Sequence, residues 1–261
     1  MTTTSPQHLT VMPMENNLGA RVENVGLATD ADDVLVAQLR EVLLQHHVLV
    51  LPAQDLTALE LEAFGRKWGE LLTHPASPHR DTPYIQFIRA SGALGGFGTW
   101  HSDMTWHPTP PTITMLHAQV LPKTGGDTAF ANQHLAYDTL PDHLREALDD
   151  ARAFHSGKVF GPDTPDSVHP AIRTHDESGK KALYINMAFT RYLVDVDRST
   201  SKAVMAEALL HATRVEFTYR HKWQLHDLVI WDNRSVMHCP ALDYEGDRFM
   251  HRAVVKGNAP T

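Results

Sequence analysis

The sequence predicts a mainly β fold with flanking helices, whose core is a double-stranded β-helix (a jelly roll of the cupin type). Three observations predict it. Short apolar runs with strand character surround the residues that carry the chemistry, as at Leu228–Trp231 and Arg248–Val255. Helical spacing is strongest in segments early and late in the chain. No internal repeat or convincing linker interrupts the 261 residues, so we expect one domain over residues 1–261.

The first predicted elements are a helix and a strand. Residues Asp32–His46 carry apolar side chains at helical spacing, among them Leu35 and Leu39. Acidic residues stand at the start of this segment, where they complement the helix dipole. The next run, Val48–Leu51, is apolar throughout and predicts a short buried strand.

A second helix is predicted by its start and stop signals. Thr57 and Glu60 have the spacing of a capping box, in which the side chain of each residue bonds the backbone of the other. Leu61, Phe64 and Trp68 then form an apolar stripe, which stops at Gly69. Beyond it, Thr112–Leu121 mixes apolar and polar residues in a pattern that favours a strand.

The second half of the chain predicts two helices and then two strands. Leu140–Leu148 and Lys202–Arg214 have amphipathic helical spacing. Leu228–Trp231 is typical of a buried strand, and Asp232-Asn233 directly after it is turn chemistry. Arg248–Val255 alternates as a second strand does.

The composition excludes several classes of protein. The formal net charge is −8 and basic runs are absent, which argues against a nucleic acid or an anionic membrane as partner. A single cysteine, Cys239, excludes an internal disulfide and suits a reducing compartment. The start of the chain lacks a signal core, and no apolar run approaches membrane-spanning length. We therefore expect a soluble cytoplasmic protein.

The first candidate site segment is Trp100–Asp103. If it is a strand, His101 and Asp103 point to one face and can reach one metal ion. A His-x-Asp triplet alone is weak evidence, because a second one, His79–Asp81, occurs without an obvious partner. The glycine-rich stretch Gly92–Gly98 before the first triplet predicts a mobile loop.

The second segment supplies a further imidazole and two guanidinium groups. His238 follows the predicted turn at Asp232-Asn233. Arg248 and Arg252 then share one face of the predicted strand, together with Met250. A guanidinium group in a partly dry pocket binds a carboxylate through two parallel hydrogen bonds. The alternative is that both arginines lie on a solvated face.

A third segment is the predicted tight turn Lys123–Thr128, which lies between two apolar runs. The hydroxyl of Thr128 can serve the same carboxylate as the arginines. Together the segments provide two imidazoles, one carboxylate and two guanidinium groups. This set suits one Fe(II) ion with room for an anionic co-substrate and O2.

These segments belong to a longer series of motifs, which covers most of the chain: Trp100-His101-Ser102-Asp103-Met104-Thr105-Trp106, Pro110-Pro111, Leu121-Pro122-Lys123-Thr124-Gly125-Gly126-Asp127-Thr128, His169-Pro170, Ser178-Gly179-Lys180, Trp231-Asp232-Asn233-Arg234 and His251-Arg252. With these motifs the chain resembles the TauD/TfdA family, the taurine dioxygenase-like Fe(II)- and 2-oxoglutarate-dependent oxygenases. The resemblance implies that 2-oxoglutarate and O2 are consumed and that succinate and CO2 are released.

The resemblance also implies roles for single residues. It implies that the iron ligands are His101, Asp103 and His238. It further implies that Thr128 and Arg248 bind the distal carboxylate of 2-oxoglutarate, and it places Arg252 near the metal-chelating end of that molecule.

The resemblance says less about the substrate. His74 matches a substrate-binding histidine of taurine-type members, or else is a buried structural histidine, and Phe189 matches a pocket aromatic. Ser77 stands where those members have a tyrosine, so we expect a small organic acid with an apolar body rather than taurine. Gly92–Gly98 and Gly157–Val168 are the candidate lids.

Two other functional classes remain open from the residues alone. One is a cupin-like metalloenzyme that takes no 2-oxoglutarate and needs no arginine pair. The other is a non-catalytic jelly-roll protein that binds a small ligand without turnover. The family resemblance further suggests a homo-oligomer.

Overall fold

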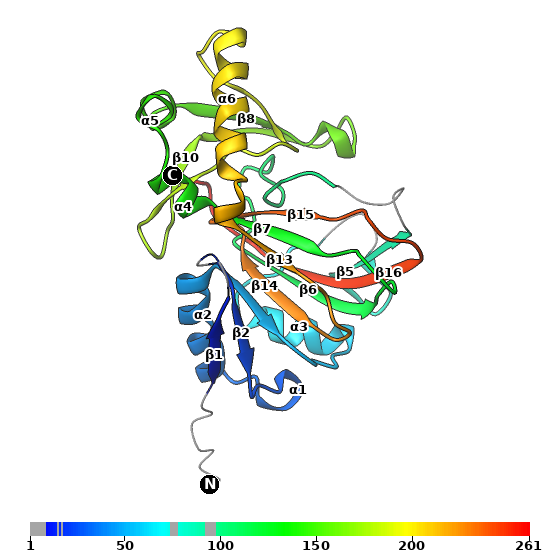
Figure 1. The fold of residues 1–261 in the computed structure, drawn as a ribbon. Helices are drawn as coiled ribbons and strands as arrows, with labels where there is room; N and C mark the ends of the chain where they lie inside the picture. The colour runs from blue at the N-terminus through cyan, green and yellow to red at the C-terminus, as the bar shows by residue number, and fades with distance from the viewer. Residues whose placement is uncertain (1–8, 15, 17, 74–77, 92–97) are drawn as a thin grey trace.

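The computed structural model describes residues 9–14, 16, 18–73, 78–91 and 98–261. Their largest sheet has eight strands in the order β1-β2-β3-β14-β6-β16-β5-β4 (Figure 1). In chain order these are β1 (Thr10–Pro13), β2 (Ala20–Glu23), β3 (Val48–Leu51), β4 (Pro78–His79), β5 (Thr82–Ser91), β6 (Ile113–Val120), β14 (Leu228–Asp232) and β16 (Asp247–Val255). Except for the parallel pair β2–β3, neighbouring strands are antiparallel.

A smaller antiparallel sheet faces the large one, in the order β13-β7-β15. Its strands are β7 (Thr128–Asn132), β13 (Thr218–His221) and β15 (Val236–Pro240). Side chains from both sheets form one core cluster, in which Phe130 and Val236 from the small sheet meet Leu116 and Val229 from the large one. The two sheets therefore pack face to face, and the described chain confirms the predicted mainly β class.

Helices cover the outer face of the large sheet. The helices on this side are α1 (Leu27–Asp30), α2 (Asp33–His46) and α3 (Ala58–Arg66). Leu39 of α2 and Phe64 of α3 pack in one core cluster with Ile230 and Met115 of the sheet. The predicted capping box opens α3, and α2 begins one residue after the predicted Asp32, whose side chain caps it.

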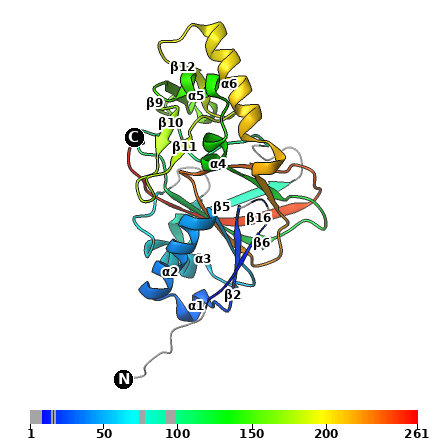
Figure 2. The same cartoon turned by 60° about the vertical axis from the view of Figure 1, so that its left-hand side comes forward.

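A third layer of helices and short strands lies at one end of the molecule, where α6 rises away from the sheets (Figures 1 and 2). Its elements are α4 (Gln133–Asp138), α5 (Asp142–Leu148), β8 (Arg152–Ser156), η3 (Lys158–Phe160), β9 (Asp166–Pro170), β10 (Ile172–Thr174), β11 (Lys181–Leu183), β12 (Thr190–Leu193), α6 (Arg198–Ala212) and η4 (Val215–Phe217). The helix α6 starts before the predicted Lys202, because the carboxylate of Asp197 accepts the Ser199 and Thr200 amides and caps it there.

The strand predictions differ in accuracy. Val48–Leu51 is a strand with the predicted bounds, and Leu228–Trp231 and Arg248–Val255 are each extended by one residue. The strand predicted at Thr112–Leu121 is Ile113–Val120. Among the described residues, no helix combines the length and the apolar character that a membrane crossing needs.

Candidate active site

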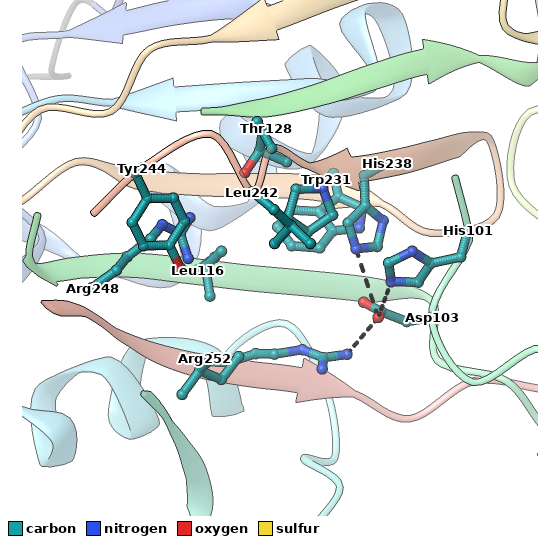
Figure 3. A pocket seen from close by; sticks show the side chains of 13 residues that line it. His101, Asp103, Leu116, Thr128, Trp231, His238, Leu242, Tyr244, Arg248 and Arg252 are labelled. Carbon is teal, nitrogen blue, oxygen red and sulfur yellow. Dashed lines mark ion pairs between the residues drawn. The ribbon is translucent and has the colours of Figure 1, made fainter. Parts of the chain in front are cut away.

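A cavity of about 180 Å3 lies between the two sheets. Its walls come from the inner faces of β5, β6, β14 and β16, from the small sheet, and from the segment after β15 (Figure 3). The lining residues are Ile88, His101, Asp103, Leu116, Thr128, Trp231, His238, Pro240, Ala241, Leu242, Tyr244, Arg248 and Arg252. Six of the eight residues predicted for the site therefore share one cavity.

Three of these residues form a group of potential metal ligands. One donor atom each from His101, Asp103 and His238 lies within 4.8 Å of the other two, and all three residues are buried. The Oδ1 atom of Asp103 is 3.9 Å from Nε2 of His101 and 3.8 Å from Nε2 of His238 (Figure 3). The donors converge from one side, as in the two-histidine, one-carboxylate group of non-haem iron enzymes.

The backbone brings the two histidines together although they are far apart in the sequence. The amide of His101 donates to the carbonyl of His238 at 2.9 Å, and the amide of His238 donates in return at 2.7 Å. These two bonds form an isolated bridge rather than a continuous strand. The ring of His101 is then fixed by its Nδ1, 2.7 Å from the Thr99 carbonyl, which leaves the lone pair on Nε2.

The prediction that His101 and Asp103 are positions one and three of a strand is wrong. After the bridge at His101 the chain turns, and Met104 takes a left-handed φ of 49°. The Asn233 side chain takes the place of a strand partner: it accepts from the amide of Asp103 at 2.6 Å and donates to its carbonyl at 3.0 Å. Because Asn233 pairs both backbone groups of Asp103, this residue can face the histidines without being part of a strand.

The charge state of the group suits a cation. Burial opposes ionisation of Asp103, but Arg252 and the two histidines outweigh it and hold the pKa of this carboxyl well below its usual range. Arg252 Nη2 lies 2.7 Å from Asp103 Oδ1, and the Thr114 hydroxyl donates to Oδ2 at 2.8 Å. Burial lowers the pKa of His101 and His238, which keeps both imidazoles neutral. A carboxylate and neutral imidazoles are the forms that bind metals.

A second group of polar side chains lines the same cavity apart from the metal group (Figure 3). Arg248 is only 6% exposed, and neither its Nε nor its Nη2 has a hydrogen-bond partner in the described chain. Burial lowers the pKa of this guanidinium group. Such a cation is costly to bury unless an anion joins it, so its donors are suited to an incoming carboxylate. Arg252 lies on the same face of β16, as the sequence predicts.

The turn before Thr128 lets the small sheet approach Arg248. Gly126 has a φ of 74°, and a Cβ atom there would lie 3.3 Å from a Tyr244 ring carbon and 3.4 Å from the Arg248 Cδ. A residue with a side chain would be strained at this φ and crowded by the Tyr244 ring. Glycine therefore permits Thr128 and Arg248 to line the same end of the cavity.

An aromatic wall stands on the other side of His101. The rings of Phe189 and His101 are edge to face, with centroids 5.9 Å apart. The ring centroid of Phe160 lies 5.9 Å from that of Phe189 and 6.0 Å from that of Trp106. The sequence predicts a site role for Phe189 alone in this wall. His74 lies outside the described residues, as does most of the glycine-rich stretch 92–98.

Two other candidates are not part of the metal group. Asp232 is fully buried, but Arg234 binds its Oδ2 at 2.7 Å and His175 lies 2.9 Å from the same oxygen. Asp232 is the last residue of β14 rather than part of the turn that the sequence predicts, and Arg234 and His175 hold its carboxylate. The Nδ1 atom of His79 lies 3.7 Å from Oδ2 of Asp81, and no third ligand joins them in the part of the chain that the structure describes.

Two polar residues of this region are not predicted from the sequence as part of the site. Asn233 is recognised only as turn chemistry, and Trp223 has no assigned role. Trp223 donates its indole N–H to the Thr128 hydroxyl at 3.1 Å. No local pattern reveals either contact, because Asn233 is 130 residues from Asp103 and Trp223 is 95 residues from Thr128.

The donor set fits an iron(II) ion with a 2-oxoacid beside it. The His–Asp–His group offers three ligands from one side, and the buried Arg248 offers unpaired donors within the same cavity. A dicarboxylate that chelates the metal at one end brings its other carboxylate toward such a guanidinium group. Neither feature alone points to this chemistry, but the two in one cavity are compatible with it.

Comparisons with known proteins agree with this chemistry. The family model described as "Taurine catabolism dioxygenase TauD, TfdA family" matches residues 10–254. An alpha-ketoglutarate-dependent sulfate ester dioxygenase of Pseudomonas putida is 32% identical, over 97% of this chain and 91% of that protein. An alpha-ketoglutarate-dependent 2,4-dichlorophenoxyacetate dioxygenase of Cupriavidus pinatubonensis is 31% identical, over 87% and 90%.

The fold has similar solved structures as well. The crystal structure of a taurine dioxygenase from Burkholderia xenovorans superposes with a TM-score of 0.88 at 34% sequence identity. The match covers 98% of this chain and 91% of that one. The jelly-roll core predicted from the sequence is thereby confirmed.

Proposed function

This chain belongs to the taurine catabolism dioxygenase TauD, TfdA family, and we propose that His101, Asp103 and His238 hold the iron(II) of an alpha-ketoglutarate-dependent dioxygenase. The reaction class is that of its relatives: oxidation of a small anionic organic molecule with 2-oxoglutarate (alpha-ketoglutarate) as co-substrate. The two alternative classes, a metalloenzyme without 2-oxoglutarate and a binding protein without turnover, are not supported by these relatives.

The buried guanidinium group of Arg248 is the observation that supports the co-substrate site. It lies in the cavity that the metal group also lines, with donors that no described residue takes up. We assign the distal carboxylate of 2-oxoglutarate to Arg248 and to the hydroxyl of Thr128. Arg252, already paired with Asp103, stands beside the metal group, where the keto-acid end would lie.

The protein's own part in the reaction is positioning and protection. Bound iron, 2-oxoglutarate and O2 together supply the oxidising chemistry that attacks a C–H bond and releases succinate and CO2. Asp103 contributes the negative charge of the ligand set, and Thr99 fixes the ring of His101 for binding through Nε2. The apolar walls, among them Trp231 and Leu116, keep water away from the reacting groups.

The substrate we propose is a small organic acid with an apolar body. Phe189, Phe160 and Trp106 form an aromatic wall beside His101, which suits an alkyl or aryl group. The relatives named for sulfate esters and for dichlorophenoxyacetate act on molecules of this kind. We retain His74 as the proposed partner of the anionic group. Hydroxylation and oxidative cleavage are both within this chemistry.

Further proposals concern the context of the enzyme. We propose that residues 1–261 work as one catalytic domain, since the site draws on residues from His101 to Arg252. A homo-oligomer is proposed from the family resemblance. A reducing cytoplasmic setting suits an iron(II) site beside the free cysteine Cys239.

The test is a substrate panel assayed by succinate release from 2-oxoglutarate, with a linear alkyl sulfate, an aryloxyalkanoate and taurine. We expect the first two classes to stimulate succinate formation and taurine to do so weakly. Phe189→Ala should raise the KM for an apolar substrate, whereas Phe154→Ala, which removes a ring stacked on Tyr192 instead, should not. Preference for taurine would overturn the substrate class while leaving the reaction class in place.

A further inference from the structure

Trp223 contacts both groups assigned to the distal carboxylate, although it does not line the cavity itself. It lies between β13 and β14 and is half-buried. Its indole N–H donates to Oγ1 of Thr128 at 3.1 Å, and the Arg248 Cζ lies 5.6 Å from the centre of its ring. One side chain therefore bridges the hydroxyl and the guanidinium group of the proposed co-substrate pocket.

The bond to Thr128 has a consequence for the direction of its hydroxyl proton. A threonine hydroxyl has one proton to donate and two lone pairs that accept. Because the indole N–H occupies one lone pair, the O–H bond points elsewhere, and Thr128 lies in the wall of the cavity. The hydroxyl proton is thus left to donate to a carboxylate oxygen in the cavity.

The contact between the Trp223 indole and Arg248 also prepares the pocket for a carboxylate. A guanidinium group within about 6 Å of an indole centre is attracted to the ring face. Arg248 is 6% exposed, so water screens this attraction only weakly. The indole therefore helps to hold the long arginine side chain in one position before an anion arrives, which lowers the entropy cost of binding it.

Trp223 is itself held by the contact of its ring with a buried, hydrogen-bonded His–Asp pair. The ring of His221 meets the indole edge to face at 4.7 Å, and Nε2 of His221 lies 3.1 Å from Asp227 Oδ2. Asp227 Oδ2 also accepts the amide of Gln224 at 2.9 Å, which ties down the chain beside Trp223. In the sheet register His221 stands opposite Thr128, so these residues form one connected unit.

We propose that Trp223 is a positioning residue for 2-oxoglutarate: it orients the Thr128 hydroxyl and the Arg248 guanidinium group for the distal carboxylate. The proposal rests on the proposed function of the site. Trp223 should affect the affinity for 2-oxoacids that carry a distal carboxylate. It should leave iron binding and the affinity for a monocarboxylic 2-oxoacid unchanged, since the latter offers nothing to Thr128 or Arg248.

The experiment is an anaerobic titration of the iron(II)-loaded protein with 2-oxoglutarate or with 2-oxovalerate, followed by the visible absorption of the iron–2-oxoacid chelate. Trp223→Phe keeps an aromatic face but removes the N–H donor. We expect its dissociation constant for 2-oxoglutarate to rise about fivefold, the equivalent of one neutral hydrogen bond, and that for 2-oxovalerate to stay the same. Trp68→Phe, which removes an indole N–H in the core beneath α2 and α3, is the matched control.

A double-mutant cycle separates this role from general support of the fold. In a Thr128→Val background, where the indole has no hydroxyl to orient, Trp223→Phe should add little to the loss of 2-oxoglutarate affinity. Fully additive losses, or equal weakening of both 2-oxoacids, would overturn the proposal. Trp223→Tyr serves in the same comparison if the phenylalanine variant does not fold. Absence of the absorption with every 2-oxoacid in the unmodified protein would instead contradict the proposed function.

Discussion

The Asn233 side chain makes two hydrogen bonds to the backbone of Asp103: its Oδ1 accepts from the amide at 2.6 Å, and its Nδ2 donates to the carbonyl at 3.0 Å. The same Nδ2 also donates to the carbonyl of Pro111 at 3.0 Å. All of these groups are buried. A side chain from the turn after β14 therefore fixes the only carboxylate of the metal group.

Asn233→Ala should weaken metal binding although Asn233 is not a ligand. Loss of an outer partner of a metal ligand typically costs about 10- to 100-fold in affinity, and the three buried hydrogen bonds are together worth about 3 kcal/mol of stability. Calorimetric titration with Co(II) and urea unfolding measure the two effects. Asn132→Ala is the matched control: this buried asparagine caps α4, so stability should fall while metal affinity holds. If Asn233→Ala binds Co(II) as tightly as Asn132→Ala does, Asn233 does not support the metal site.

His101→Ala and Asp103→Ala should each abolish metal retention and turnover. Either change removes one of the three proposed ligands, and the remaining two are too few to hold the metal ion. Metal content after anaerobic loading and desalting gives the direct reading. His79→Ala, taken from the second His-x-Asp triplet, should retain both metal and activity. Normal turnover in Asp103→Ala would refute the assignment of the metal group.

Arg248→Ala should raise the KM for 2-oxoglutarate about 10- to 100-fold while iron still binds, since a charge-assisted pair with the distal carboxylate is lost. The comparison is with Arg89→Ala, which lies over the Phe249 ring outside the cavity and should leave KM unchanged. If KM in Arg248→Ala stays the same, the carboxylate role passes to Arg252.

Stability should fall in mild acid because of His155. This residue has no exposed surface, and burial lowers its pKa from 6.5 to about 3. Folded protein therefore keeps the imidazole neutral, whereas unfolded protein takes up a proton below pH 6.5. The contribution of His155 to stability is full above pH 6.5 and decreases down to about pH 3, by about 2 kcal/mol at pH 5.

Urea unfolding at pH 7 and pH 5 measures this contribution. His155→Gln, which has no titrating ring, should lose less stability between the two pH values than the unmodified protein does. The exposed histidine His143 provides the control, since His143→Gln should leave the difference unchanged. The same difference in all three proteins would show that His155 is not the group that titrates.

The parts of the fold that the sequence predicts depend on local signals. The capping box of Thr57 and Glu60 places the start of α3 because a helix start is set by neighbouring residues. The alternation from Arg248 to Val255 gives the face of both arginines, since side chains alternate along any strand.

The parts that it does not predict depend on contacts between distant segments. His101 and Asp103 are placed by a bridge to His238 and by the amide of Asn233, which no local pattern around residue 101 contains. Trp106 and Phe160 join Phe189 in one wall only after η3 folds beside it. The proposed metal ligands could be named from motifs, but the residues that hold them in place could not.

The most direct measurement is an anaerobic titration of the metal-free protein with Fe(II) and then with 2-oxoglutarate, read by visible absorption. We predict a new band after the second addition, absent from Asp103→Ala and requiring far more 2-oxoglutarate in Arg248→Ala. Tight iron binding with no band at any 2-oxoglutarate concentration would contradict the proposal that this cavity holds the metal and the co-substrate together.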